Sequence, residues 1–184
     1  ALPWSHPAQL SASLVPLHDC RHGCQQLWPK YYHLEACIDS NSASYLRTAV
    51  LLLGENGTGK STVAEILHAA SGAPDSTFVR IDCALASPEK LREGLLGSAG
   101  AGGSWVQQAK GGTLFLQHLP CLDLELQEQL VSVLRNNANH FRLICSSGED
   151  LERLVEEGRF NEELLYRVAS LPLTAPPLRE RIED

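Results

Sequence analysis

The sequence contains no methionine, few aromatic residues, no excess of positive charge and no long apolar run, and each shortage excludes a class of protein. Aromatic residues make up 6% of the 184 residues, whereas 43% are hydrophobic and 20% charged, which is typical of a globular chain rather than a disordered one. No apolar run approaches bilayer-spanning length and no signal-peptide pattern is present, so we expect no membrane partner. Because methionine is absent and the chain begins at Ala1, we expect a trimmed fragment.

Charge and cysteine content narrow further the classes of protein to which the chain could belong. The 15 basic residues are outnumbered by 22 acidic ones, giving a net charge of −7, so no broad basic face for DNA is expected here. Six cysteines are too few for a disulfide framework in a chain of this length, and reduced thiols are expected. Two histidines and two cysteines alternate in one short segment: His18, Cys20, His22 and Cys24. Zinc sites usually bring two ligand pairs together, so an ordinary loop is favoured and a metal site is the alternative.

One segment has a specific chemical pattern, and it follows the apolar run Val50–Leu53. It reads Gly54-Glu55-Asn56-Gly57-Thr58-Gly59-Lys60-Ser61, which matches G-x-x-x-x-G-K-[ST] at every fixed position. Glycines leave room for backbone N–H groups to surround a phosphate, and the following helix adds the positive end of its dipole. We predict a nucleotide-phosphate site from Gly54 to Thr62, in which Lys60 reaches the β- and γ-phosphates and the Ser61 hydroxyl ligates Mg²⁺. A chance glycine turn is the alternative.

The rest of the chain alternates predicted strands and helices. Strands are expected at about 50–53, 78–81, 113–116, 141–145 and 171–173, and helices at about 30–39, 61–70, 88–96, 104–110, 124–135, 149–157 and 161–168. This alternation favours an α/β fold with a mostly parallel central sheet and helices on both faces. Residues 1–29 are predicted to be a linker or irregular extension, and residues 30–184 the nucleotide-binding domain.

Four segments carry further motifs: Val50–Ser61, Phe78–Cys83, Gly111–Leu116 and Gly158–Asp184. Together they resemble the AAA+ central domain of bacterial enhancer-binding proteins, the ATPases that activate sigma-54 RNA polymerase. The resemblance covers about residues 30–184 and implies a three-layer P-loop NTPase core, with the family's C-terminal helical lid missing from this fragment. It also implies ATP or ADP as ligand, a bacterial cytoplasmic location, self-association such as a hexameric ring, DNA binding through a domain outside the fragment, and RNA polymerase as a partner.

The family's catalytic positions are where this sequence departs from it. Gln117 and His118 stand where the family has Asp-Glu, and a neutral amide is a poor anchor for Mg²⁺. Gly148 stands at the asparagine of the sensor. Asn161 replaces the first of two arginines that reach a neighbouring subunit, whereas Arg167 retains the second. One such arginine is worth about 10³–10⁵ in rate. We predict a domain that binds nucleotide, holds Mg²⁺ only weakly through Ser61 and hydrolyses ATP little or not at all.

Two consequences and two alternatives follow from these departures. Nucleotide affinity should depend less on Mg²⁺ than is usual for the family. The family's Gly-Ala-Phe-Thr-Gly-Ala loop is absent between Leu96 and Trp105, so standard sigma-54 remodelling is not expected unless another surface, such as Trp105, has taken over. One alternative is a slow ATPase that uses His118 and Arg167. The other is a regulator that binds a cyclic dinucleotide, which is disfavoured because the helix after Lys60 offers Glu65 and no arginine.

Overall fold

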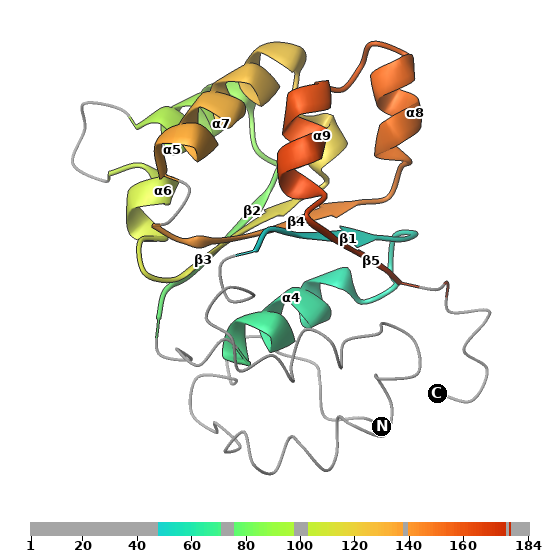
Figure 1. The fold of residues 1–184 in the computed structure, drawn as a ribbon. Helices are drawn as coiled ribbons and strands as arrows, with labels where there is room; N and C mark the ends of the chain where they lie inside the picture. The colour runs from blue at the N-terminus through green and yellow to red at the C-terminus, as the bar shows by residue number, and fades with distance from the viewer. Residues whose placement is uncertain (1–47, 71–75, 98–102, 138–139, 176, 178–184) are drawn as a thin grey trace, which may run out of the picture.

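A five-stranded parallel sheet forms the centre of the computed structural model, which describes residues 48–70, 76–97, 103–137, 140–175 and 177 (Figure 1). Its strands are β1 (Val50–Leu53), β2 (Phe78–Asp82), β3 (Thr113–Gln117), β4 (Arg142–Ser147) and β5 (Leu171–Thr174). They lie in the order β2-β3-β4-β1-β5, and every pairing is parallel. The segments that follow the strands therefore leave the sheet at one edge, where open α/β sheets bind their ligands.

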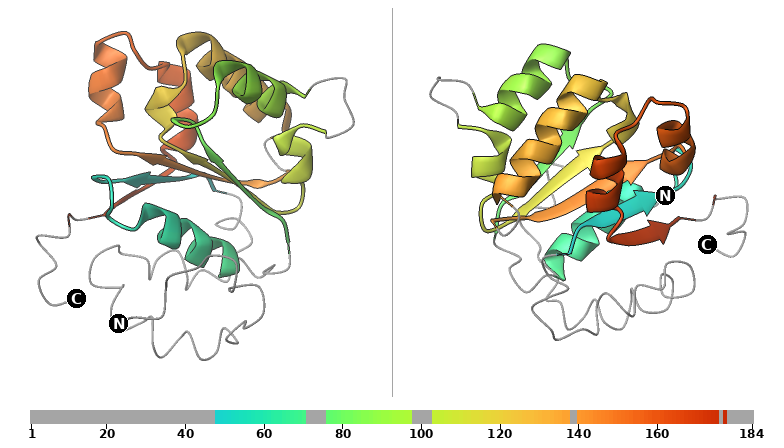
Figure 2. Two further views of the ribbon diagram at one scale, coloured as in Figure 1. Left: turned by 180° about the vertical axis from the view of Figure 1, so that it is seen from behind. Right: turned by 45° about the horizontal axis from the view of Figure 1, so that its top comes forward.

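Helices cover both faces of this sheet, as predicted. Helix α4 (Lys60–Ala69) lies on one face (Figures 1 and 2). The other face carries α5 (Pro88–Leu96), α6 (Trp105–Gln108), α7 (Leu124–Asn137), α8 (Leu151–Glu156) and α9 (Glu162–Val168). A short 3₁₀ helix, η3 (Leu119–Cys121), follows β3. The result is the three-layer arrangement expected of a P-loop NTPase. None of the described helices is long and apolar enough to cross a bilayer.

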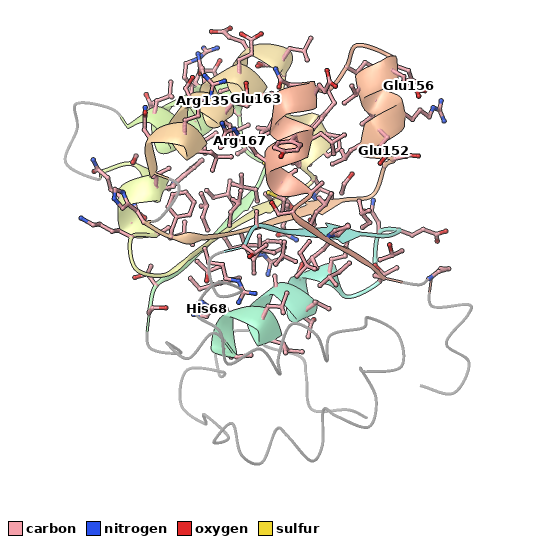
Figure 3. The ribbon with its side chains drawn as sticks, in the orientation of Figure 1. His68, Arg135, Glu152, Glu156, Glu163 and Arg167 are labelled. Carbon is pink, nitrogen blue, oxygen red and sulfur yellow. The ribbon has the colours of Figure 1, made fainter. Side chains whose placement is uncertain are left out.

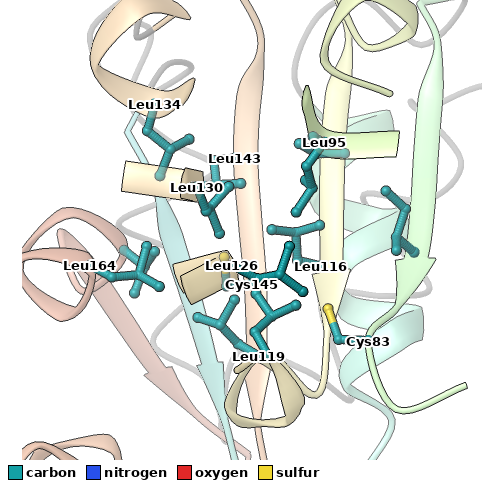
Figure 4. Close-up of a cluster of buried hydrophobic side chains, with 14 of the residues drawn as sticks. Cys83, Leu95, Leu116, Leu119, Leu126, Leu130, Leu134, Leu143, Cys145 and Leu164 are labelled. Carbon is teal, nitrogen blue, oxygen red and sulfur yellow. The ribbon is translucent and has the colours of Figure 1, made fainter. Parts of the chain in front are cut away.

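Two hydrophobic cores hold the layers together because successive strand residues point to opposite faces. In β1, Val50 and Leu52 pack toward α4, whereas Leu51 belongs to the larger cluster beneath the helices of the other face. Figure 4 shows this larger cluster, in which Leu116 and Cys145 of the sheet meet leucines of the covering helices. The strands are consequently buried on both faces, which explains why their sequences are continuous apolar runs rather than alternating ones.

Most predicted elements are present, with bounds shifted where a polar residue has a specific local role. Ser87 and Asp123 cap α5 and α7 through hydrogen bonds to the backbone N–H groups of Lys90 and Leu126. Helix α8 begins at Leu151 rather than near 149, because the Asp150 side chain accepts from two backbone N–H groups and acts as its N-cap. Strand β4 extends to Ser147 rather than ending at 145, since its last residues pair with the end of β1. The predicted extension 1–29 and helix 30–39 lie outside the described residues.

Candidate functional site

The loop between β1 and α4 encloses the side chain of its own lysine. Lys60 Nζ donates hydrogen bonds to the carbonyl oxygens of Gly54 at 2.6 Å and Glu55 at 2.8 Å, and the residue is only 7% exposed. This burial lowers the pKa of Lys60. The Thr58 hydroxyl also donates to the Glu55 carbonyl, at 2.9 Å. The loop is therefore closed on itself by groups that an incoming phosphate would have to rearrange.

Three glycines make this loop shape possible. Gly57 and Gly59 have φ values of 85° and 84°, in the left-handed region that favours glycine, and Gly59 is the N-cap of α4. Gly54 has a φ of 144°, and a Cβ there would lie 2.6 Å from the Ala175 carbonyl oxygen. Residues 55–57 and Thr62 are exposed, whereas Ser61 is half-buried. The predicted phosphate loop thus has the backbone that its glycines imply, with its tip open to solvent.

Gln117, at the end of β3, bridges the Ser61 hydroxyl and an arginine. Its Nε2 donates to Ser61 Oγ at 2.7 Å, and its Oε1 accepts from Arg80 Nε at 2.6 Å. The orientation of the amide is dictated by chemistry, because arginine is only a donor and the amide must turn its oxygen toward it. Arg80 also forms an ion pair with Glu65 on α4, at 3.6 Å. Residues from β2, β3 and α4 therefore meet at one point beside the phosphate loop.

This donor set does not fit the Mg²⁺ ion that the family implies. Mg²⁺ is bound through oxygen ligands, usually carboxylates, and keeps strict octahedral geometry. At this position the side-chain amide oxygen of Gln117 faces a guanidinium, and the Ser61 hydroxyl oxygen faces an amide N–H. Both oxygens that would ligate the ion are already acceptors of protein hydrogen bonds. The prediction that Ser61 ligates Mg²⁺ therefore lacks a supporting set of ligands.

His118 follows Gln117 and pairs with an acidic residue that sequence analysis did not single out. Its Nδ1 lies 2.9 Å from Asp82 Oδ1, and both side chains are partly exposed, at 32% and 23%. Asp82 ends β2 directly opposite Gln117 in the parallel register. His118 has a φ of 52°, the one positive value of a residue other than glycine within the described part of the chain. The tight turn after β3 thus aims the imidazole at Asp82.

The end of β4 lies against the phosphate loop, as expected of a sensor position, but carries no side chain there. The Gly54 N–H donates to the Ser147 carbonyl at 3.2 Å. A Cβ placed on Gly148 would lie 3.4 Å from Asn56 Oδ1 and 3.7 Å from the Gly54 carbonyl oxygen. Any side chain at this position would therefore contact the loop.

Asn161 and Arg167 have structural partners on α9 and its neighbours. Asn161 is the N-cap of α9: its Oδ1 accepts from the Leu164 N–H at 2.9 Å, and its own N–H donates to Gln127 Oε1 at 2.7 Å. Arg167 donates to Glu163, which also pairs with Arg135 of α7 (Figure 3). Helix α9 covers the face of the sheet opposite α4. Within the described part of the chain, Arg167 thus pairs with Glu163 and forms no ion pair with a residue of the phosphate loop.

Arg80 is a second residue that sequence analysis missed, after Asp82. The helix after Lys60 carries no arginine, yet β2 supplies one to the same place through its contacts with Gln117 and Glu65. A signal was present, because alternation along β2 puts Arg80 on the same side of the strand as Asp82, its last residue. The argument against a basic group beside Glu65 was therefore incomplete.

Other candidates have ordinary packing roles or lie outside the described residues. No group of three or more possible metal ligands occurs in the described segments, and His18, Cys20, His22 and Cys24 are not among them. The thiols of Cys83, Cys121 and Cys145 are free, and burial raises the pKa of Cys83 to about 12. Trp105 is half-buried against Gly94, where a Cβ would lie 2.3 Å from the indole ring. It packs on α5 rather than projecting as an exposed contact.

Comparisons with known proteins identify the family to which the chain is similar. A family model described as "Sigma-54 interaction domain" matches residues 32–174. The regulatory protein LuxO of Vibrio parahaemolyticus is 38% identical over 167 residues, covering 80% of this chain and 36% of LuxO. The transcriptional regulatory protein XylR of Pseudomonas putida is 34% identical over 175 residues, covering 85% of this chain and 31% of XylR. The chain thus spans about a third of the length of these curated relatives.

Solved structures give the same fold. NtrX from Brucella abortus in complex with ATP superposes with a TM-score of 0.73 at 26% identity, covering 83% of this chain and 38% of NtrX. The P-loop NTPase domain of the E. coli sigma-54 transport activator has a TM-score of 0.55 at 28% identity, covering 73% of this chain and 96% of that domain.

Proposed function

The chain belongs to the sigma-54 interaction domain family, and from this we infer that it is a nucleotide-binding AAA+ module of a bacterial transcription regulator that binds ATP or ADP and hydrolyses ATP poorly. The observation that carries the proposal is the hydrogen bond from the Gln117 amide to the Ser61 hydroxyl beside a complete phosphate loop. The loop supports binding, and the amide in the place of a carboxylate supports slow chemistry.

The binding half of the proposal rests on the loop and on the neighbouring structures. Lys60 is held at the loop by two carbonyl oxygens, which a phosphate would replace as its partners. Backbone N–H groups at the start of α4 add donors and a favourable dipole for an anion. NtrX, solved with ADP and with ATP, has a TM-score of 0.73 in both complexes. We therefore propose Gly54 to Thr62 as the phosphate-binding residues of this domain.

The hydrolysis half rests on groups that are missing from the described site. Gln117 and His118 at the end of β3 supply no carboxylate, and a positioned general base typically contributes about 10²–10⁴ in rate. Gly148 has no side chain to place near the loop, and Asn161 caps a helix where the family has an arginine. These three replacements affect different parts of one site, so each of them by itself should limit the reaction.

One observation favours the alternative of a slow ATPase. Asp82 accepts from His118 Nδ1, if that nitrogen carries the proton, and so leaves Nε2 able to take a proton from water. Such a pair would give His118 the role of a weak general base, with Arg167 acting on a neighbouring subunit. A cyclic dinucleotide remains a lower alternative, with Arg80 as the nearby cation.

The partners of the whole protein follow from the family and are part of the proposal. We expect a cytoplasmic bacterial regulator that self-associates, with a hexameric ring as one form. It would bind DNA through a domain outside this chain and act on RNA polymerase. Because the Gly-Ala-Phe-Thr-Gly-Ala segment is absent and Trp105 packs on α5, we do not expect contact with sigma-54 through the family's usual loop.

Nucleotide titration and phosphate release on the full-length protein test both halves. Isothermal titration with ATP and ADP should show binding that Lys60→Ala abolishes, with circular dichroism confirming that the variant remains folded. Steady-state phosphate release should stay below about 0.1 per second, near the low end of enzyme turnover. Absence of nucleotide binding would overturn the proposal. Faster turnover that disappears in Lys60→Ala would favour the ATPase instead.

A further inference from the structure

Beside the phosphate loop, a chain of protein hydrogen bonds joins a cationic side chain to the Ser61 hydroxyl. The chain runs from Arg80 Nε to Gln117 Oε1 at 2.6 Å, and from Gln117 Nε2 to Ser61 Oγ at 2.7 Å. Gln117 is 6% exposed, so water competes little for its amide. Arg80, Gln117 and Ser61 lie on β2, β3 and α4, so only the tertiary structure brings them together. A positive charge is thereby held two hydrogen bonds from the hydroxyl that usually faces a metal.

The direction of these hydrogen bonds determines what Ser61 can bind. Because its oxygen accepts from Gln117, the remaining O–H hydrogen is available to donate to an acceptor such as a phosphate oxygen. A hydroxyl facing a metal would instead offer its oxygen to the ion. To ligate Mg²⁺ here, Ser61 and Gln117 would have to offer their remaining lone pairs to the ion, at oxygens toward which the Gln117 amide N–H and the Arg80 guanidinium are already directed.

Two carboxylates at this corner of the site already have partners within the protein. Glu65, one turn along α4 from Ser61, forms an ion pair with the Arg80 guanidinium at 3.6 Å. Asp82, the last residue of β2, is hydrogen-bonded to His118. Glu65 is thus paired with a guanidinium, and Asp82 is hydrogen-bonded to an imidazole.

We propose that the Arg80–Gln117 pair replaces Mg²⁺ in this domain, so that the ligand bound is metal-free nucleotide rather than the Mg²⁺–nucleotide complex. This inference rests on the proposed nucleotide-binding function. Arg80 acts through Gln117 and supplies a fixed positive charge, and Ser61 supplies a hydroxyl donor. Binding is then insensitive to the cellular Mg²⁺ concentration, and the ion that would promote phosphoryl transfer is not recruited.

The test is a pair of ADP titrations of the full-length protein, one with excess Mg²⁺ and one with EDTA. We expect the two Kd values to differ by less than about tenfold, which corresponds to about 1.4 kcal/mol. Arg80→Gln should weaken binding in EDTA at least fivefold. Arg92→Gln is the matched control, because Arg92 is similarly exposed (43% against 48%) and paired with Glu125 on the helical layer. That variant should bind as the wild type does.

A second readout does not depend on any variant. With Mn²⁺ in place of Mg²⁺, electron paramagnetic resonance should detect no protein-bound ion in the ADP complex. One bound Mn²⁺ per nucleotide would overturn the inference, as would a loss of affinity greater than tenfold in EDTA or equal affinities for Arg80→Gln and Arg92→Gln. In each of these cases nucleotide binding itself would stand. Absence of ADP binding under both conditions would instead overturn the proposed function, and this inference with it.

Discussion

Restoring the family's arginine by Asn161→Arg should destabilise the domain, because the present asparagine has a structural role. Its side-chain oxygen accepts from the Leu164 N–H at 2.9 Å and caps a helix of only seven residues. Replacing an asparagine N-cap costs about 1 kcal/mol, within a range of about 0.5–2. The hydrogen bond from the Asn161 backbone N–H to Gln127 survives the substitution, so the loss should be confined to the cap.

Thermal and urea unfolding measure this loss directly. In a domain of this size about 1 kcal/mol lowers Tm by about 2–4 °C. Asn161→Asp is the matched control, since it keeps an acceptor at the cap and places a negative charge at the helix N-terminus, where the dipole favours it. It should unfold close to the wild type. If Asn161→Arg is as stable as the wild type, or both variants lose equal stability, the cap is not what positions α9.

The same variant also tests the explanation for slow hydrolysis. Gln117 and His118 are unchanged in Asn161→Arg, so phosphate release should not rise even when the arginine is available to a neighbouring subunit. A trans-acting arginine contributes about 10³–10⁵ in rate where the rest of the site is competent. An increase of that size would refute the argument that the residues after β3 limit the reaction.

Three further predictions concern the loop, the core and the thiols. Gly54→Ala should abolish ADP binding and lower Tm, because the added Cβ would lie 2.6 Å from the Ala175 carbonyl oxygen. A Cβ at Gly57 would meet no atom within 4 Å, so Gly57→Ala should have the smaller effect. ADP titration and thermal unfolding of the two variants measure the difference. Burial, reinforced by a nearby arginine charge, lowers the pKa of His68 below the ordinary histidine value of about 6.5, so the unfolded state binds the proton more readily and stability falls as pH drops below that value. Urea unfolding at pH 7.5 and 5.5 should show a larger loss for the wild type than for His68→Asn, and equal losses would contradict this account. Iodoacetamide at pH 8 should modify exposed Cys121 and spare Cys83, whose buried thiol has a pKa raised to about 12. Peptide mapping by mass spectrometry identifies the labelled cysteines. Labelling of Cys83 in the folded protein would show that the end of β2 opens.

Local features of this protein were predictable from its sequence because they depend on neighbouring residues. Apolar runs flanked by turn residues located the strands, and Ser87 and Asp123 marked the start of two helices that the structure confirms. The phosphate loop was recognisable because its glycines, lysine and serine act within eight consecutive residues. The segments that resemble the AAA+ family indicated the fold class for the same reason, because each motif is formed by consecutive residues.

Only the tertiary structure decided which residues surround Ser61. Arg80 and Gln117 are 37 positions apart, and Gln117 and Ser61 are 56 apart, so their contacts depend on strand order and register rather than on any local pattern. Asp82 meets His118 for the same reason, because parallel pairing brings the ends of β2 and β3 together. A sequence motif is enough to identify a phosphate loop, but the charged groups and hydrogen-bond donors beside the loop are supplied by strands that are distant in the sequence. Their identity follows from how the sheet is assembled.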